Sequence, residues 1–323
     1  RYKFIDFYKF IGITLMIMGH VGFGSEFDKF IHAFHMPLFF IASGFCFSGG
    51  RPFRDFLRKK VKSILVPYFV FSLISFLALR KINEIRLSSM QHVVWINNDG
   101  TPIAGVWFLT ALFFANIVYY WIDKISDNNV KWFVVVVFFL LGASLESWVE
   151  ITIPWSIAPG MVGILFLHVG KCSKEMKRDI APTWSLALGI GVTTVLIFIN
   201  DHVNIRISHY DYLALFFFNA VLMCVLILIA SERIENAISE SRIFSLSCSI
   251  GMNSICYLVL NQMAIRYSCV FVDSMPENAT WGGIRPVIIL VLSYVVMYFV
   301  TELITRTGLC ILIGQKYTKK GSI

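Results

Sequence analysis

The chain has 323 residues, of which 57% are hydrophobic and only 15% are charged, and its mean hydropathy is +0.71. A soluble domain carries roughly 25% charged residues, so this composition excludes a water-soluble protein. The net charge of +8 does not indicate nucleic-acid binding, because the basic residues lie in the gaps between apolar runs. That placement is typical of membrane proteins, whose orientation it determines.

Apolar runs recur along the whole chain, and a membrane span needs about 17 to 25 such residues. We therefore predict an all-α, polytopic membrane protein of about ten transmembrane helices. The runs are 4–23, 30–48, 63–79, 105–122, 131–146, 156–170, 184–200, 211–230, 246–268 and 286–304. The sequence contains no internal repeat, and we expect a single membrane-embedded domain over 1–323.

The distribution of Lys and Arg predicts the orientation. With the N-terminus in the cytoplasm, 20 of these residues fall on the cytoplasmic side and 7 on the other side. Such an excess is the positive-inside pattern. We therefore expect both termini in the cytoplasm, external loops at 80–104 and 269–285, contacts with membrane lipids, and a multi-pass protein of the inner (cytoplasmic) membrane.

The first run contains three ionisable residues: Asp6, Lys9 and His20. Ionisable side chains inside a span are rare and usually face the protein interior. Lys9 and His20 are 11 residues apart, which is 20° past three full helical turns, so they share one stripe roughly 16 Å long. Asp6 lies one turn before Lys9. A structural interpretation stays open, in which Asp6 and Lys9 pair at a helix end and His20 lies in the outer interface.

The second run contains His35 followed by Pro37. A short connection joins the first two runs, so we expect His20 and His35 to meet near one face of the membrane. Histidine titrates near neutral pH and suits acid–base catalysis. Metal binding is the alternative, but two histidines without a third ligand at suitable spacing are a weak metal signal. The seven cysteines include no CxxC pair. We therefore expect no metal.

Six basic residues crowd residues 51–62: Arg51, Arg54, Arg58, Lys59, Lys60 and Lys62. Their simplest role is to orient the protein and bind anionic headgroups. A second interpretation is a phosphate-binding site for a polyanionic substrate that enters from the cytoplasm. The charge run alone does not distinguish the two.

Several segments together resemble the acyltransferase-3 family of membrane O-acyltransferases. Lys9 and His20 match its Arg/Lys-x10-His motif, and the segment from Phe34 to Phe45 matches its second-span signature. Weaker similarities follow at Arg58–Lys62 with Pro67-Tyr68, at Trp107-Phe108-Leu109, at Pro154-Trp155-Ser156 and at His168-Val169-Gly170.

This resemblance implies transfer of an acyl group, usually acetyl, from cytoplasmic acyl-CoA to a hydroxyl of a carbohydrate. The acceptor would be a bacterial cell-surface polysaccharide or its lipid-linked precursor. His20 would serve as general base or transient acyl carrier, with His35 as its partner, and Lys9 and Asp6 would position the donor. The phosphates of acetyl-CoA would be held by Arg54, Arg58, Lys59, Lys60 and Lys62.

Two features of the sequence depart from the family pattern. The basic residue of the first motif is often Arg, and here it is Lys9. Leu260-Asn261-Gln262 falls where many members have a His.

Two alternatives come from other functional classes: a glycan or lipid transporter, and a non-catalytic membrane subunit. A transporter would be expected to show matching half-repeats with interrupted helices, which the sequence lacks.

Overall fold

The computed structural model describes residues 2–79, 105–149, 153–176, 182–200, 202–275 and 283–315. These residues form helices, and the β pairing among them is one isolated bridge between Asn204 and His209. The expected all-α fold is confirmed. The external loop expected over 80–104 lies outside the described residues.

The helices follow one another with short connections. The first half contains α1 (Lys3–Val21), α2 (Ser25–His32), α3 (His35–Phe45), α4 (Phe53–Lys60), the π-helical η1 (Val61–Leu65), α5 (Val66–Leu79), α7 (Trp107–Ile122) and α8 (Asn128–Val149). The second half contains η3 (Pro154–Ser156), α9 (Ile157–Glu175), α10 (Thr183–Ile199), η4 (Ile205–Ile207), α11 (Leu213–Ile238), α12 (Arg242–Met252), α13 (Ser254–Asp273), α14 (Arg285–Arg306) and η5 (Gly308–Ile313).

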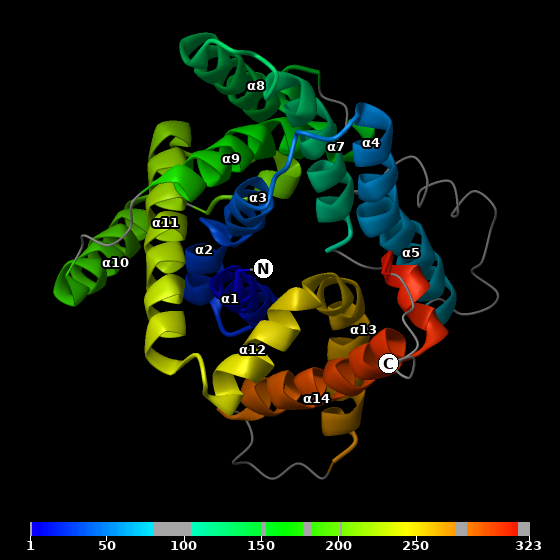
Figure 1. Cartoon of the computed structure of the whole chain (residues 1–323). Coiled ribbons are helices and arrows are strands. Elements are labelled where there is room, and N and C mark those ends of the chain that lie inside the picture. The colour runs from blue at the N-terminus through cyan, green and yellow to red at the C-terminus, as the bar shows by residue number, and fades with distance from the viewer. Residues whose placement is uncertain are drawn as a thin grey trace.

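Helix α1 lies inside the bundle, between α3, α11, α12 and α13 (Figure 1). Three of its apolar side chains, Tyr8, Ile13 and Ile17, are completely buried. Helix α12 approaches its backbone closely, because a methyl group at Gly251 would overlap the carbonyl oxygen of Asp6. The surrounding helices therefore fix the position of α1, which carries three of the predicted site residues.

Helices α3 and α9 also cross at close range. A methyl group at Gly44 of α3 would overlap the carbonyl oxygen of Leu167, and one at Gly170 of α9 would overlap that of Ile41. Small residues at a crossing let two helix backbones approach within van der Waals contact, which is a main source of stability for helices in lipid. This crossing holds α3, and therefore His35, against the core.

The outermost helices present apolar side chains to the surroundings. On α10 the exposed residues Leu188, Val192, Val195 and Ile199 form one face, and α14 repeats the pattern with Val287, Val291, Val295 and Phe299. Spacings of three and four residues place side chains on one side of a helix. Such stripes would be unfavourable in water and fit contact with lipid.

Among the residues that the structure describes, six helices are long and apolar enough to cross a bilayer, namely α1, α8, η3 with α9, α11, α13 and α14. Helices α7 and α10 are shorter and also apolar. A multi-pass membrane protein is therefore confirmed, whereas the number ten stays a prediction. At 1.5 Å per residue the 16 residues of α7 span about 24 Å, most of the roughly 30 Å hydrocarbon layer.

Two predicted runs are broken in the structure. The run 30–48 divides into α2 and α3, which begins at His35 with Pro37 in its first turn. The first four N–H groups of a helix have no partner within it, so a proline costs little there. The run 246–268 divides into α12 and α13 at Asn253, whose side-chain amide donates to the Ser249 carbonyl at 3.0 Å.

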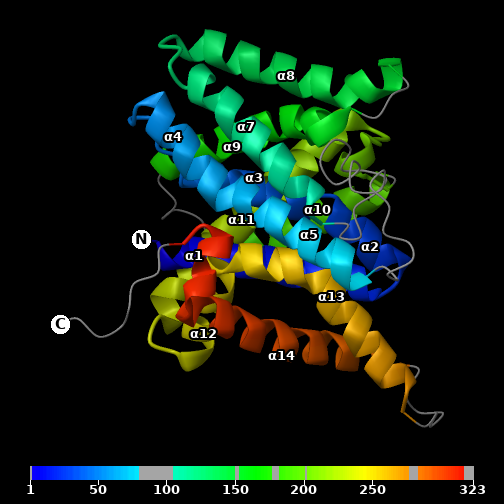
Figure 2. The same ribbon diagram turned by 90° about the vertical axis from the view of Figure 1, so that its right-hand side faces the viewer.

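The bundle has two distinct ends. The start of α1, the basic helix α4 and η5 lie at one end, and α2 lies at the other (Figure 2). This arrangement places the basic segment and the beginning of the described chain on the same side, as the positive-inside pattern requires. Which side faces the cytoplasm stays a prediction.

Candidate functional site

A cavity of about 110 Å³ lies at the end of α1 that faces α2. It brings together His20, from the last turn of α1, and His35, the first residue of α3. We call it the histidine cavity. Its lining residues are Met16, Gly19, His20, Ile31, His32, His35, Met36, Gly105, Trp107, Asn204, Ile205 and Arg206.

His35 is held in a defined tautomer. Its ring is buried, and Nδ1 lies 2.7 Å from the carbonyl oxygen of Ile31. A carbonyl can only accept, so Nδ1 carries the proton and donates it. In the neutral ring Nε2 therefore has a free lone pair and can accept a proton. His20 is exposed, which leaves its ring accessible to a substrate in the cavity.

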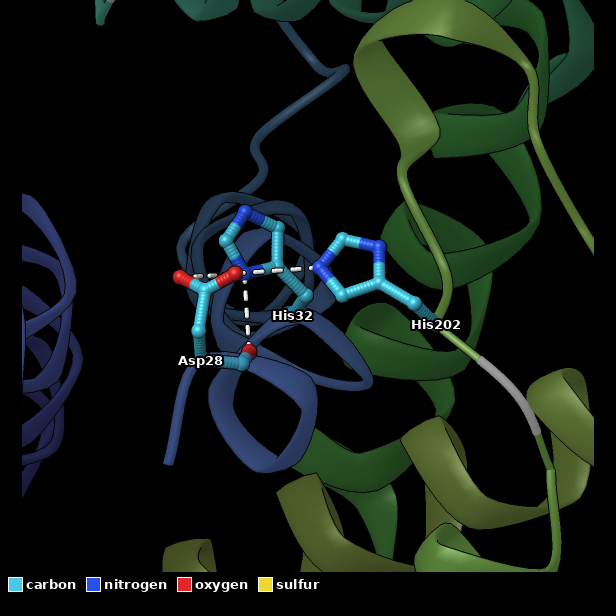
Figure 3. A group of neighbouring side chains, drawn as sticks. All are labelled: Asp28, His32 and His202. Carbon is cyan, nitrogen blue, oxygen red and sulfur yellow. Dashed lines mark hydrogen bonds and ion pairs between the residues drawn. The ribbon is translucent and has the colours of Figure 1, made fainter. Parts of the chain in front are cut away.

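His32 adds a third imidazole to the cavity. Its ring centroid lies 5.0 Å from that of His35 and 4.9 Å from that of His202. The carboxylate of Asp28 lies between two rings, 3.2 Å from His32 Nδ1 and 3.0 Å from His202 Nε2 (Figure 3). His32 Nδ1 also lies 2.8 Å from the backbone oxygen of Asp28.

The connection between α10 and α11 closes one wall of the cavity. Asn204, Ile205 and Arg206 line it, and the pairing of Asn204 with His209 folds this connection into a tight turn. The sequence prediction missed this wall, together with Asp28, His32 and His202. The spacing of Asp28 and His32, one helical turn apart, was the available signal.

Asp6 and Lys9 form the ion pair that their spacing predicted. Lys9 Nζ lies 2.9 Å from Asp6 Oδ1, and the Asp6 side chain is almost completely buried. Neither residue lines the histidine cavity, from which the helix separates Lys9 by roughly 16 Å. The structure therefore places the four predicted catalytic residues in two groups, one toward each end of α1.

The basic segment borders a second cavity, of about 940 Å³, which we call the basic cavity. It lies between α4, η1, the start of α5 and the C-terminal part of η5 with the residues that follow it. Its lining residues are Asp55, Arg58, Lys59, Lys62, Ser63, Val66, Ile311, Gly314 and Gln315. Three of the five predicted phosphate-binding residues line it. Arg54 is exposed and does not line it.

Lys60, the fifth of these residues, faces a different environment. Its side chain is half-buried, and Nζ lies 5.5 Å from the centre of the Phe56 ring. Burial, and secondarily the charge of Lys59, lowers the pKa of Lys60 to about 8. The charge of Lys60 is therefore expected to change in the weakly alkaline range.

Three other segments that resemble the family lie outside both cavities. The ring of Trp155 lies against that of Tyr68, with centroids 6.3 Å apart, so two of the resembling segments meet. His168 is buried on α9, and its Nδ1 lies 2.7 Å from the Tyr119 hydroxyl. Asn261, in the segment where many family members have a His, is completely buried on α13.

Comparisons with known proteins complete the description of the site. The family profile described as an acyltransferase domain, of the acyltransferase-3 type, matches residues 2–306. The match includes all nine residues predicted for the site. Searches of curated proteins and of solved structures found no match.

Proposed function

The chain belongs to the acyltransferase-3 family, and we propose that it moves an acetyl group from cytoplasmic acetyl-CoA to a hydroxyl of a cell-surface polysaccharide or its lipid-linked precursor. The observation that carries this proposal is the meeting of His20 and His35 in one cavity, at the opposite end of α1 from the Lys9–Asp6 pair. Acyl transfer in the membrane is the family's activity. The acetyl donor, the glycan acceptor and the cytoplasmic membrane are our proposals.

The donor would bind at the basic cavity. A volume of about 940 Å³ lies at the upper end of the range for sites of drug-sized ligands. Arg58, Lys59 and Lys62 line it and supply the charge-assisted hydrogen bonds that phosphate oxygens favour. The pantetheine arm would then extend past Lys9 and Asp6 toward His20.

The acceptor hydroxyl would react in the histidine cavity. Its oxygen attacks the thioester carbonyl carbon while a histidine Nε2 takes the hydroxyl proton. The C–S bond then breaks, and the same proton passes to the departing sulfur, giving an ester and free CoA thiol. A cavity of about 110 Å³ holds only a few water-sized groups. The sugar ring would therefore remain outside, and only the acceptor hydroxyl and the thioester would enter.

His20 and His35 divide this work according to their surroundings. His35 is buried and oriented by the Ile31 carbonyl, so it can hold a proton at a fixed place. His20 is exposed at the end of α1, where it can reach the acceptor as base or carry the acyl group transiently.

Thiol release from acetyl-CoA tests the proposal directly. Purified protein in lipid, supplied with acetyl-CoA and envelope glycan from its host, should release CoA thiol and form alkali-labile acetyl ester. His20→Asn should reduce transfer by about 10²–10⁴-fold, the usual value of general acid–base catalysis, while acetyl-CoA binding persists. His209→Asn, an exposed histidine outside the cavity, is the matched control. Near-normal transfer by folded His20→Asn protein removes His20 from the mechanism.

A charge-removal series tests the donor site separately. Changing Arg58, Lys59 and Lys62 together to Ala should raise the KM for acetyl-CoA, because each hydrogen bond to a charged group contributes about 1.5–3 kcal/mol at most. Arg51→Ala removes a charge from the same segment but from outside the basic cavity, so it should leave KM unchanged. Unchanged acetyl-CoA binding in the triple variant would reduce the segment to an orientation signal.

A further inference from the structure

Asp28, His32 and His202 form a compact group of metal-ligating side chains beside the histidine cavity (Figure 3). One ligand atom from each lies within 4.8 Å of the others. The two closest pairs, each involving the Asp28 carboxylate, are separated by 3.0 and 3.2 Å. In a tetrahedral zinc site with bonds of 2.0–2.2 Å, neighbouring ligand atoms are about 3.3–3.6 Å apart. Small side-chain adjustments would therefore accommodate an ion.

The types of ligand select the metal. Two imidazoles and one carboxylate are a common zinc set that leaves the fourth position open, whereas calcium and magnesium prefer oxygen ligands. Asp28 and His32 are one turn apart on α2 and so face the same side. All three side chains are half-buried, so the site is protected but accessible to an ion from solution.

The surrounding charges set the strength of the site. Asp28 supplies one negative charge, while Arg206 lines the neighbouring cavity and Lys29 lies next to Asp28 on α2. These cations oppose a divalent ion, so we expect weaker binding than at a structural zinc site. Binding through His32 Nδ1 also requires the tautomer whose proton is on Nε2, so the hydrogen bond to the Asp28 carbonyl must break, which weakens binding further.

We propose that Asp28, His32 and His202 bind a zinc ion that fastens the α10–α11 connection to α2. Asn204, Ile205 and Arg206 lie two to four residues after His202 and form one wall of the histidine cavity. An ion held between His202 and α2 would therefore fix that wall. The sequence expectation of no metal rested on the absence of a third ligand near His20 and His35, and these are different residues, which meet only in the folded chain.

Zinc binding to the resting full-length protein tests this inference without any acyl transfer. Protein in detergent is stripped with a chelator and titrated with zinc at buffered free concentrations, and bound metal is measured by mass spectrometry. Wild type and His209→Ala should bind zinc alike. His202→Ala and Asp28→Asn should bind more than about 100-fold more weakly, because even outer-shell partners of a metal are worth 10–100-fold. Equal zinc binding by wild type and His202→Ala overturns the proposal.

Cobalt substitution gives a second readout that does not depend on the variants folding. Cobalt(II) in a tetrahedral His/carboxylate site gives intense visible absorption bands, and titration of the wild-type protein should produce them in a saturable manner. Zinc should then remove them by competition. Absence of these bands overturns the proposal. Because neither measurement uses acetyl-CoA, failure of the zinc site is distinguishable from failure of the proposed acyltransferase function.

Discussion

Replacement of His35 by Asn separates the chemical role of this residue from its structural role. The proton on His35 Nδ1 is donated to the Ile31 carbonyl over 2.7 Å. The side-chain nitrogen of Asn lies the same number of bonds from the backbone as Nδ1, so His35→Asn can keep this hydrogen bond. It removes Nε2, the atom that can accept a proton and to which we assign the proton transfer.

The expected magnitude follows from these contacts. Loss of a proton acceptor should lower transfer by about 10²–10⁴-fold, which corresponds to about 2.7–5.4 kcal/mol in activation free energy. The stability change should be small, since the hydrogen bond is retained. His35→Ala should also lose that bond, while the Ile31 carbonyl still accepts from the Phe34 N–H at 3.2 Å, so the cost should be about 0.5–1.5 kcal/mol in the free energy of unfolding.

The assay compares acetyl transfer and thermal unfolding for wild type, His35→Asn and His35→Ala in the same lipid. We expect both variants to lose transfer, and only His35→Ala to unfold clearly earlier. Acetyl-CoA binding, measured at equilibrium, should be retained by His35→Asn because the basic cavity is at the other end of the bundle. Near wild-type transfer by His35→Asn would refute the role given to Nε2, whatever its stability.

Three further predictions concern topology, packing and pH. In a background without native cysteines, an impermeant thiol reagent added to intact cells should label cysteine at position 26 and not at position 55, because the positive-inside pattern places the basic segment in the cytoplasm; the reverse labelling refutes the orientation. Gly170→Val should destabilise the fold, because its side chain would overlap the Ile41 carbonyl and overpacking costs about 1–3 kcal/mol. Gly50→Ala, with open space around it, should leave the unfolding temperature unchanged. Equal unfolding temperatures for the two variants would contradict the close approach of α3 and α9. Lys60 does not line the basic cavity but directly follows Lys59, which does, so it adds positive charge beside the proposed donor site. Affinity for acetyl-CoA should therefore fall as pH rises through about 8, where Lys60 loses its charge, and Lys60→Arg should abolish this fall because Arg stays protonated; an identical pH profile in that variant would exclude Lys60 from donor binding.

Local sequence information predicted the fold class and part of the candidate site. Hydrophobicity and the rarity of charged residues predicted the all-α membrane fold, since every backbone polar group in lipid must be satisfied within a helix. Helical spacing placed Lys9 and His20 on one stripe of α1 and predicted the Asp6–Lys9 pair, whose distance is 2.9 Å. The short connection after α1 predicted that His20 and His35 meet near one face of the membrane, and both residues line the histidine cavity.

The sequence did not reveal where helices break within an apolar run. Hydropathy is almost continuous across residues 30–48 and 246–268, whereas the breaks at Ala33–Phe34 and Asn253 depend on backbone geometry and side-chain hydrogen bonds. Average hydrophobicity over a window does not register these local interactions.

Tertiary structure alone decided which residues complete the site. Asp28 and His202 are 174 positions apart, and their meeting depends on how α10 packs against α2 and α11. Likewise, Arg58 and Gln315 line one cavity because η5 returns to η1. Helix-to-helix packing depends on the complementary shapes of distant surfaces, which the spacing of residues along one segment does not encode. The sequence therefore determined the membrane class and the stripe on α1, and the packing of distant helices determined the walls of both cavities.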